Sequence, residues 1–205
     1  MNIVFLYLNY ESTILNHEDF LSSNPNLHSM HTLLRQQSDF DINIIQRSAF
    51  ESTPIVDGVQ YFFIVDEFPN KLRWWQEPKS SFEVIKKLKP NITYVTGLNL
   101  PLQFRWLRRQ IGDDITIIGQ HTGERIWANR KIWLQQFGLR VVDGFIFSSE
   151  TDKNHWTRTS VIIPRQCTYL IPSLESDIQK TVQSLLAIFS MMDKQKKLVD
   201  VSDVI

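Results

Sequence analysis

The sequence predicts an α/β fold in which a parallel sheet carries helices on both faces. Short apolar and β-branched runs alternate along the chain with segments whose apolar residues recur at helical spacing, a pattern typical of βαβ units. The chain has 205 residues, of which 42% are hydrophobic and 21% charged, so it can bury a full core as one domain. It contains no internal repeat, no low-complexity tract and no Pro/Gly/Ser linker that would separate domains.

Seven runs have the length and composition of strands. The first begins at the N-terminus without a basic region or a cleavage site, so we interpret it as a strand and not as a signal peptide. The Asp57-Gly58 pair is a turn signal just before the third strand. The predicted strands are Asn2–Leu8, Ile42–Ile45, Val59–Val65, Ile92–Val95, Ile115–Ile118, Phe145–Phe147 and Thr168–Ile171.

The helical segments lie between these strands. Pro101 and Gly112 have the positions of a first helical residue and a helix stop, and Gly138 is expected to end another helix. Ser80 with Glu83, and Ser176 with Gln179, have the spacing of capping boxes. The predicted helices are Leu27–Gln37, a segment from Ser80 to Pro90, Pro101–Ile111, Asn129–Phe137, Thr151–Trp156 and a last helix that begins at Ser176.

Charge and cysteine content restrict the partners and the compartment. Lys plus Arg equals Asp plus Glu at 22 each, which removes a global argument for nucleic acid, and no apolar run is long enough to span a bilayer. The only cysteine, Cys167, is interpreted as a buried small hydrophobe in a reducing compartment. We therefore expect a cytoplasmic protein, soluble or peripheral at the inner membrane face.

Several common catalytic motifs are absent. There is no Gly-x-Gly-x-x-Gly, no P-loop and no Gly-x-Ser-x-Gly elbow. His28 and His31 can share a helix face, but no carboxylate or thiol completes a metal site, so we interpret both as surface residues. Arg105, Arg108 and Arg109 are interpreted as a solvated helix face. We expect neither a metal nor a cofactor.

Polar clusters follow four of the predicted strands. In a parallel sheet all four meet at the carboxyl edge, where ligands bind, so a shared pocket is expected. Hydroxyls, amides and one histidine suit a sugar or polyol, and Trp74-Trp75 either joins them or packs under its own loop. The clusters are Asn9-Tyr10-Glu11, Gly97-Leu98-Asn99, His121–Arg125 and Ser148-Ser149-Glu150.

His121 is the first residue to consider in this set, because a β-branched run ending at Gly119 delivers it to the sheet edge. From spacing alone, a loop histidine bonded to a neighbouring carbonyl is the favoured interpretation.

Three of these segments resemble motifs of glycosyltransferase family 4. Lys89–Leu98 (KPNITYVTGL) resembles the family stretch KPDVVHVHGL. Ile117–Glu124 (IIGQHTGE) is similar to its strand and loop ivvQHHGE, and Val142–Ser149 (VDGFIFSS) resembles its strand vDgflFtS. The order and spacing of the three fit the N-terminal, acceptor-side domain of that family, and the likeness runs over most of Met1–Ser173.

This resemblance implies a three-layer, Rossmann-like half of a GT-B enzyme, a retaining glycosyltransferase whose other half holds the nucleotide-sugar. The nucleotide-sugar is then a substrate, not a cofactor, and the acceptor is a sugar or glycan. The histidine after the fifth strand, here His121, would reach the transferred sugar as the catalytic residue. Substrate contacts are expected from Tyr10, Gly97, Asn99, Thr122, Gly123, Glu124, Arg125, Ser149 and Glu150.

The sequence departs from the family pattern in its donor-binding part. No glutamate follows Glu175 and no arginine follows Arg165, so the Glu-x7-Glu donor motif cannot be present. We divide the chain into a family-like domain, residues 1–175, and a C-terminal helix and tail, residues 176–205. The chain is expected to be inactive alone or to depend on a partner chain that supplies the donor-binding domain. A non-catalytic binding or scaffolding module is the alternative.

The last predicted helix carries an apolar stripe that some surface must cover. Either the helix packs on this domain's own sheet, or the stripe forms a homodimer or partner interface. The stripe consists of Val182, Leu185, Leu186, Phe189 and Met192.

Overall fold

The computed structural model describes residues 1–10, 14–68, 70–128 and 131–202, with side chains up to residue 196. Of the predicted features, Glu11 and Asn129 lie outside the described residues. No helix in the described part of the chain is both long enough and apolar enough to cross a membrane.

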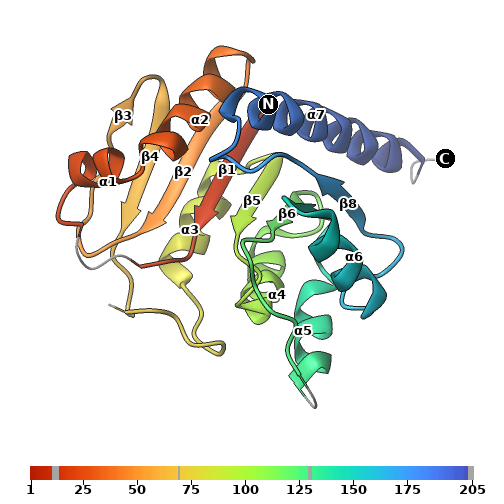
Figure 1. The fold of residues 1–205 in the computed structure, drawn as a ribbon. Helices are drawn as coiled ribbons and strands as arrows, with labels where there is room; N and C mark the ends of the chain where they lie inside the picture. The colour runs from red at the N-terminus through yellow and green to blue at the C-terminus, as the bar shows by residue number, and fades with distance from the viewer. Residues whose placement is uncertain (11–13, 69, 129–130, 203–205) are drawn as a thin grey trace.

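One sheet organises the fold, as predicted (Figure 1). Its strand order is β3-β4-β2-β1-β5-β6-β7-β8, and neighbouring strands are parallel except for the β3–β4 hairpin. The strand β3 was not predicted; it pairs with β4 across the Asp57-Gly58 turn, where both residues have positive φ. The strands are β1 (Asn2–Tyr7), β2 (Asp41–Arg47), β3 (Ile55–Val56), β4 (Val59–Ile64), β5 (Ile92–Thr96), β6 (Thr116–Gln120), β7 (Gly144–Phe147) and β8 (Cys167–Leu170).

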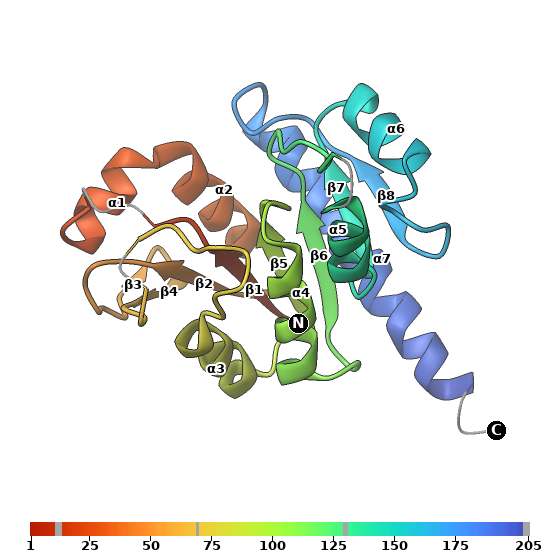
Figure 2. The same ribbon diagram turned by 90° about the horizontal axis from the view of Figure 1, so that it is seen from below.

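Helices cover both faces of this sheet, which gives the three layers (Figure 2). One core lies under α2 and α7, and the other lies under α3, α4 and the end of α5. The helices are α1 (His17–Ser23), α2 (Pro25–Gln36), α3 (Lys79–Leu88), α4 (Pro101–Ile111), α5 (Ile132–Leu139), α6 (Glu150–Arg158) and α7 (Ile178–Ser202).

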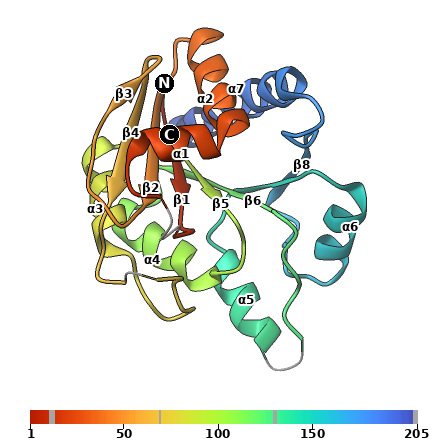
Figure 3. The ribbon, with the colours of Figure 1, turned by 60° about the vertical axis from the view of Figure 1, so that its left-hand side comes forward.

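The last helix packs on this chain's own sheet. Val182, Leu185 and Phe189 are fully buried, and Met192 is 5% exposed. The helix lies beside α2 (Figure 3), and Gln37 at the end of α2 forms side-chain hydrogen bonds with Gln179 and Gln183. The apolar stripe is therefore covered without a second copy of the chain.

Helix ends account for most of the differences from the predicted elements. The helix α1 was not predicted; Asn16 caps it by accepting a hydrogen bond from the Asp19 amide at 2.9 Å. The predicted capping boxes are wrong. The helix α3 begins at Lys79, which places Ser80 inside its first turn, and α7 is capped by Asp177, whose carboxylate accepts from the Lys180 amide at 3.0 Å.

Gly138 does not end α5, which continues to Leu139. A Cβ at position 138 would lie 2.4 Å from the carbonyl carbon of Pro101, the first residue of α4. Glycine is therefore needed here for the close approach of two helices, not for a left-handed stop.

Two arginines hold loops at opposite edges of the sheet. Arg47 is 1% exposed and forms an ion pair with Asp66 while donating to the carbonyls of Leu8 and Phe68. It thereby joins the segments that follow β1, β2 and β4. Arg108 was expected on a solvated face, but it donates to Asp143 at 2.6 Å and to carbonyls before β6 and β7.

His31 is also misplaced by the sequence interpretation, because it is fully buried and not a surface residue. Its Nε2 lies 3.0 Å from the Tyr7 hydroxyl, and its ring packs 4.8 Å from that of Phe5. Burial, and to a smaller extent the neighbouring His28, lower the pKa of His31 from 6.5 to about 3. The folded chain thus holds this imidazole neutral. His28 itself bonds Tyr61 and Asp57.

We predict that replacing Gly138 by alanine destabilises the protein, although alanine is the better helix former. Overpacking against Pro101 should lower the free energy of unfolding by about 1–3 kcal/mol, which exceeds the gain in helix propensity of about 1 kcal/mol. Urea unfolding measures the change, with Gln136→Ala in the same helix as the control that changes propensity alone. An increase in stability for Gly138→Ala would show that the two helices are not in close contact.

We predict that acid destabilises the protein through His31. The pKa of this group is lower in the folded than in the unfolded state, so below about pH 6.5 only the unfolded chain binds the proton. Stability should fall with decreasing pH, with a contribution approaching about 1.4 kcal/mol per pH unit. Unfolding experiments between pH 4 and 7 should show a smaller slope for His31→Gln than for the control His155→Gln. Equal slopes in the two variants would contradict this assignment.

Candidate functional site

The carboxyl ends of β5, β6 and β7 bring three of the predicted polar clusters side by side. The amide of Gly97 donates to the carbonyl of Gln120 at 3.0 Å, and the amide of His121 donates to that of Ile146 at 2.9 Å. The parallel register therefore continues past the formal end of each strand. This register fixes the positions of the residues that follow the three strands.

A tight turn after β6 is closed by the Glu124 carboxylate. This group accepts from the Thr122 amide at 2.7 Å and from the Thr122 hydroxyl at 2.5 Å, and its side chain is 2% exposed. Gly123, at φ +93°, allows the turn, and Gly97, at φ +90°, lies against the same carboxylate. A Cβ at position 97 would be 3.2 Å from Glu124 Oε1, which explains why glycine suits this position.

The turn also orients His121, which is 3% exposed. Its Nε2 lies 3.0 Å from the Glu124 carbonyl oxygen, and since a carbonyl only accepts, Nε2 is the donor of this hydrogen bond and carries the proton in the neutral tautomer. Its Nδ1 is then left as an acceptor, 4.0 Å from Asp152 Oδ2. The rings of Phe147 and Trp156, with centroids 5.2 and 5.3 Å away, pack against the imidazole.

A cavity of about 460 Å3 adjoins this histidine. One end is polar and is formed by residues that follow β6 and β7, together with the first turn of α6. The other end is apolar and lies between α2, α7 and the segment after β8. The polar end includes Gln120, His121, Thr122, Ser148 and Asp152, and the apolar end includes Leu27, Met30, Ile171, Leu174 and Leu185.

A second, more open pocket of about 370 Å3 lies on the other side of the same turn. Thr122 and Gly123 line both cavities, while Asn99, Glu124, Arg125 and Trp127 line only the second. The turn of residues 121–125 is thus the wall between the two.

Four of the predicted substrate residues lie outside both cavities. Gly97 lines neither of them and packs against the Glu124 carboxylate. Tyr10 lies beneath the Arg47 guanidinium, whose Cζ is 5.7 Å from the centroid of the tyrosine ring. Ser149 caps α6 by accepting from the Asp152 amide, and Glu150 is exposed and pairs with Lys153 at 3.5 Å. The tryptophans of the β4–α3 loop, Trp74 and Trp75, are 44% and 51% exposed and pack against each other.

Of the predicted cluster Ser148-Ser149-Glu150, only Ser148 lines the larger cavity, since Ser149 is used as a helix cap. The sequence interpretation missed two acidic cavity residues, Asp152 and Glu175. Asp152 could have been found, since it lies one turn into a helix that starts directly after a strand end. Glu175 reaches the cavity from the crossing between β8 and α7, for which the sequence offers no local signal.

No group of three or more His, Cys, Asp or Glu side chains suited to a metal ion occurs among the described residues.

The fold resembles that of a known glycosyltransferase. One structure of sucrose-phosphate synthase from Thermosynechococcus elongatus superposes with a TM-score of 0.63 over 94% of this chain and 99% of that one, at 8% sequence identity. A longer structure of the same synthase gives a TM-score of 0.56 at 11% identity, over 84% of this chain and 48% of that one, so the present chain spans about half of its length.

No protein-family model matches the sequence, and no curated protein matches it either. At these identities the likeness establishes the fold alone. The chain has a glycosyltransferase-like, Rossmann-like α/β fold with a C-terminal helix.

Proposed function

We propose that this protein is the acceptor-side half of a retaining GT-B glycosyltransferase, of the kind found in glycosyltransferase family 4. It would transfer a sugar only together with a donor-binding half. The observation that carries this proposal is the position of His121 Nδ1 beside Asp152, at the mouth of a cavity on the carboxyl edge of a glycosyltransferase-like fold. Ligands of open α/β sheets bind at that edge.

The charge of the cavity supports an acceptor without a phosphate group. Asp152 and Glu175 line it, and neither lysine nor arginine is among the described residues around it. An anionic acceptor would meet two carboxylates and no compensating cation, which is unfavourable in a partly desolvated site. The acceptor is therefore an uncharged or cationic sugar or polyol.

The shape of the cavity supports an acceptor that also carries an apolar group. Hydroxyls of a sugar fit the polar end, where Gln120, Thr122 and Ser148 offer amide and hydroxyl groups. The apolar end between α2 and α7 is lined by leucine, isoleucine and methionine side chains, which favour an alkyl or aryl aglycone.

His121 would bind and orient the reacting hydroxyl of this acceptor. Its Nε2 proton is used by the Glu124 carbonyl, so Nδ1 accepts a hydrogen bond from the hydroxyl, and the nearby Asp152 carboxylate is available to accept from a neighbouring hydroxyl of the same sugar. The developing oxocarbenium ion and the departing diphosphate require preorganised charges that the donor-binding half would supply.

The alternative function, a binding or scaffolding module without transfer, is favoured by one observation. His121 is 3% exposed and packed against two aromatic rings, as expected for a histidine that holds a loop in place. In either case we propose a cytoplasmic location, because Cys167 is a free thiol.

We predict that an alkyl glucoside binds this protein more tightly than glucose does, and that a phosphorylated sugar binds more weakly than either. Replacing His121 by glutamine keeps a donor for the Glu124 carbonyl but removes the Nδ1 acceptor. The affinity of the His121→Gln variant for the glucoside should fall at least about tenfold, or about 1.4 kcal/mol. Isothermal titration calorimetry measures all three ligands against both proteins.

His155→Gln, an exposed histidine on α6 outside the cavity, is the matched control and should bind as the parent does. Incubation of the isolated chain with nucleotide-sugars and the bound acceptor should give no product. Robust transfer would disprove the dependence on a second half, while absence of saturable binding by any sugar would leave the scaffolding function.

A further inference from the structure

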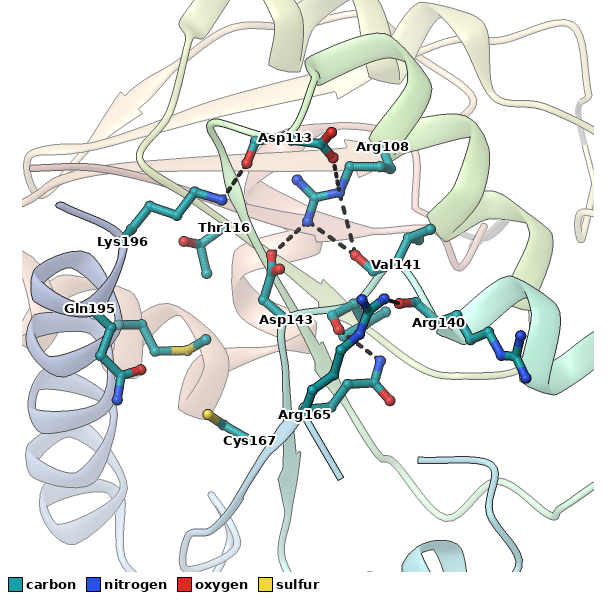
Figure 4. A pocket seen from close by; sticks show the side chains of 13 residues that line it. Arg108, Asp113, Thr116, Arg140, Val141, Asp143, Arg165, Cys167, Gln195 and Lys196 are labelled. Carbon is teal, nitrogen blue, oxygen red and sulfur yellow. Dashed lines mark hydrogen bonds and ion pairs between the residues drawn. The ribbon is translucent and has the colours of Figure 1, made fainter. Parts of the chain in front are cut away.

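A third cavity, of about 580 Å3, is shown in Figure 4. It lies at the amino edge of the sheet, opposite the candidate site. It is enclosed by the end of α4, the segments that lead into β7 and β8, and the later turns of α7. Its lining contains four cationic side chains and two carboxylates. These are Arg108, Arg140, Arg165, Lys196, Asp113 and Asp143.

The carboxylates do not neutralise this cavity. Arg108 and Asp143 form an ion pair at 2.6 Å, and the Asp143 carboxylate also accepts from the Ile117 amide at 2.7 Å, so this pair is internally balanced. Asp113 is almost fully exposed, with 97% of its side chain accessible, and lies 3.7 Å from the same Arg108. Both carboxylates therefore contact Arg108, and neither of them pairs with another cation of the lining.

The other cations are available to a ligand. Arg140 and Arg165 are exposed, and within the described residues neither guanidinium forms an ion pair with a carboxylate. Arg165 donates only to the Arg140 carbonyl, at 3.1 Å, which holds the two chain segments together and leaves most of its donors unused. Lys196 of α7 donates to the Asp113 carbonyl across the opening.

We propose that this cavity is a binding site for the phosphate group of a small molecule. Guanidinium groups match the geometry of phosphate oxygens and bind them in a bidentate manner. Arg165 presents one at the cavity, whereas the Arg140 side chain points away in Figure 4, and a rotation of this exposed side chain would bring a second guanidinium to a bound dianion. The volume exceeds that of one phosphate, so an ester with an organic part also fits. The bound anion would lie between the end of α4 and α7, on the opposite edge from His121.

We predict that phosphate compounds bind this cavity through Arg140 and Arg165. Calorimetric titration of the full chain with inorganic phosphate, pyrophosphate and glycerol 3-phosphate should show saturable binding of at least one. The double variant Arg140→Gln/Arg165→Gln should bind it at least about tenfold more weakly. Tighter binding of the ester would identify an organic phosphate as the ligand. Tighter binding of the inorganic ions would identify a free anion as the ligand. Either result supports the site.

The control Arg109→Gln removes an exposed arginine of α4 that does not line the cavity and should leave binding unchanged. His121→Gln should also bind phosphate as the parent does, which separates this site from the proposed acceptor site. Both substituted arginines are exposed, so the double variant should remain folded. Its urea unfolding curve checks this. Equal binding by the double variant and the parent, or no saturable binding of any probe, would overturn the proposal.

Discussion

The loops at the two edges of the sheet depend on buried or half-buried arginine–aspartate pairs. A parallel sheet leaves carbonyl groups at the ends of its strands, and the loops that bury them must supply donors. Arg47 does so at the carboxyl edge by joining Asp66 to carbonyls after β1 and β4, and Arg108 does so at the amino edge with Asp143. Each guanidinium satisfies several backbone carbonyls of these loops.

These pairs also explain why the two cavities differ. At the carboxyl edge Arg47 lies over the Tyr10 ring and is not part of the cavity around His121. It therefore contributes no charge to the lining of that cavity. At the amino edge Arg108 lies within the cavity wall, where it consumes the nearby carboxylates and leaves Arg140 and Arg165 unpaired. A structural contact at one edge thus creates the positive potential of the site beside it.

The sequence was sufficient for seven of the eight strands, because apolar, β-branched runs report burial on both faces directly. It was insufficient where one residue type serves two purposes. Gly138 was interpreted as a helix stop, but its role is set by Pro101 on another helix. Likewise His31 was placed on the surface because the pattern of its own helix does not reveal the Tyr7 hydroxyl that receives it.

The candidate site shows the same limit. Strand ends bring His121, Thr122 and Gly123 to the cavity, since the parallel register alone determines their neighbours. The apolar half of the cavity could not be predicted, because it forms between α2 and α7, which are distant in sequence and adjacent only in the folded chain. Local patterns identify the edge of a sheet but not the helices that close a pocket over it.

The opposite charges of the two cavities have a consequence for any ligand that carries a phosphate. Asp152 and Glu175 disfavour it at the carboxyl edge, whereas Arg140 and Arg165 attract it at the amino edge. The same helix, α7, contributes Leu185 to the first cavity and Lys196 to the second. A ligand that shifts this helix at one end therefore has a direct physical route to the shape of the cavity at the other end. The sheet separates the two sites, and α7 touches both, as does β6 through Thr116 at one end and Gln120 at the other.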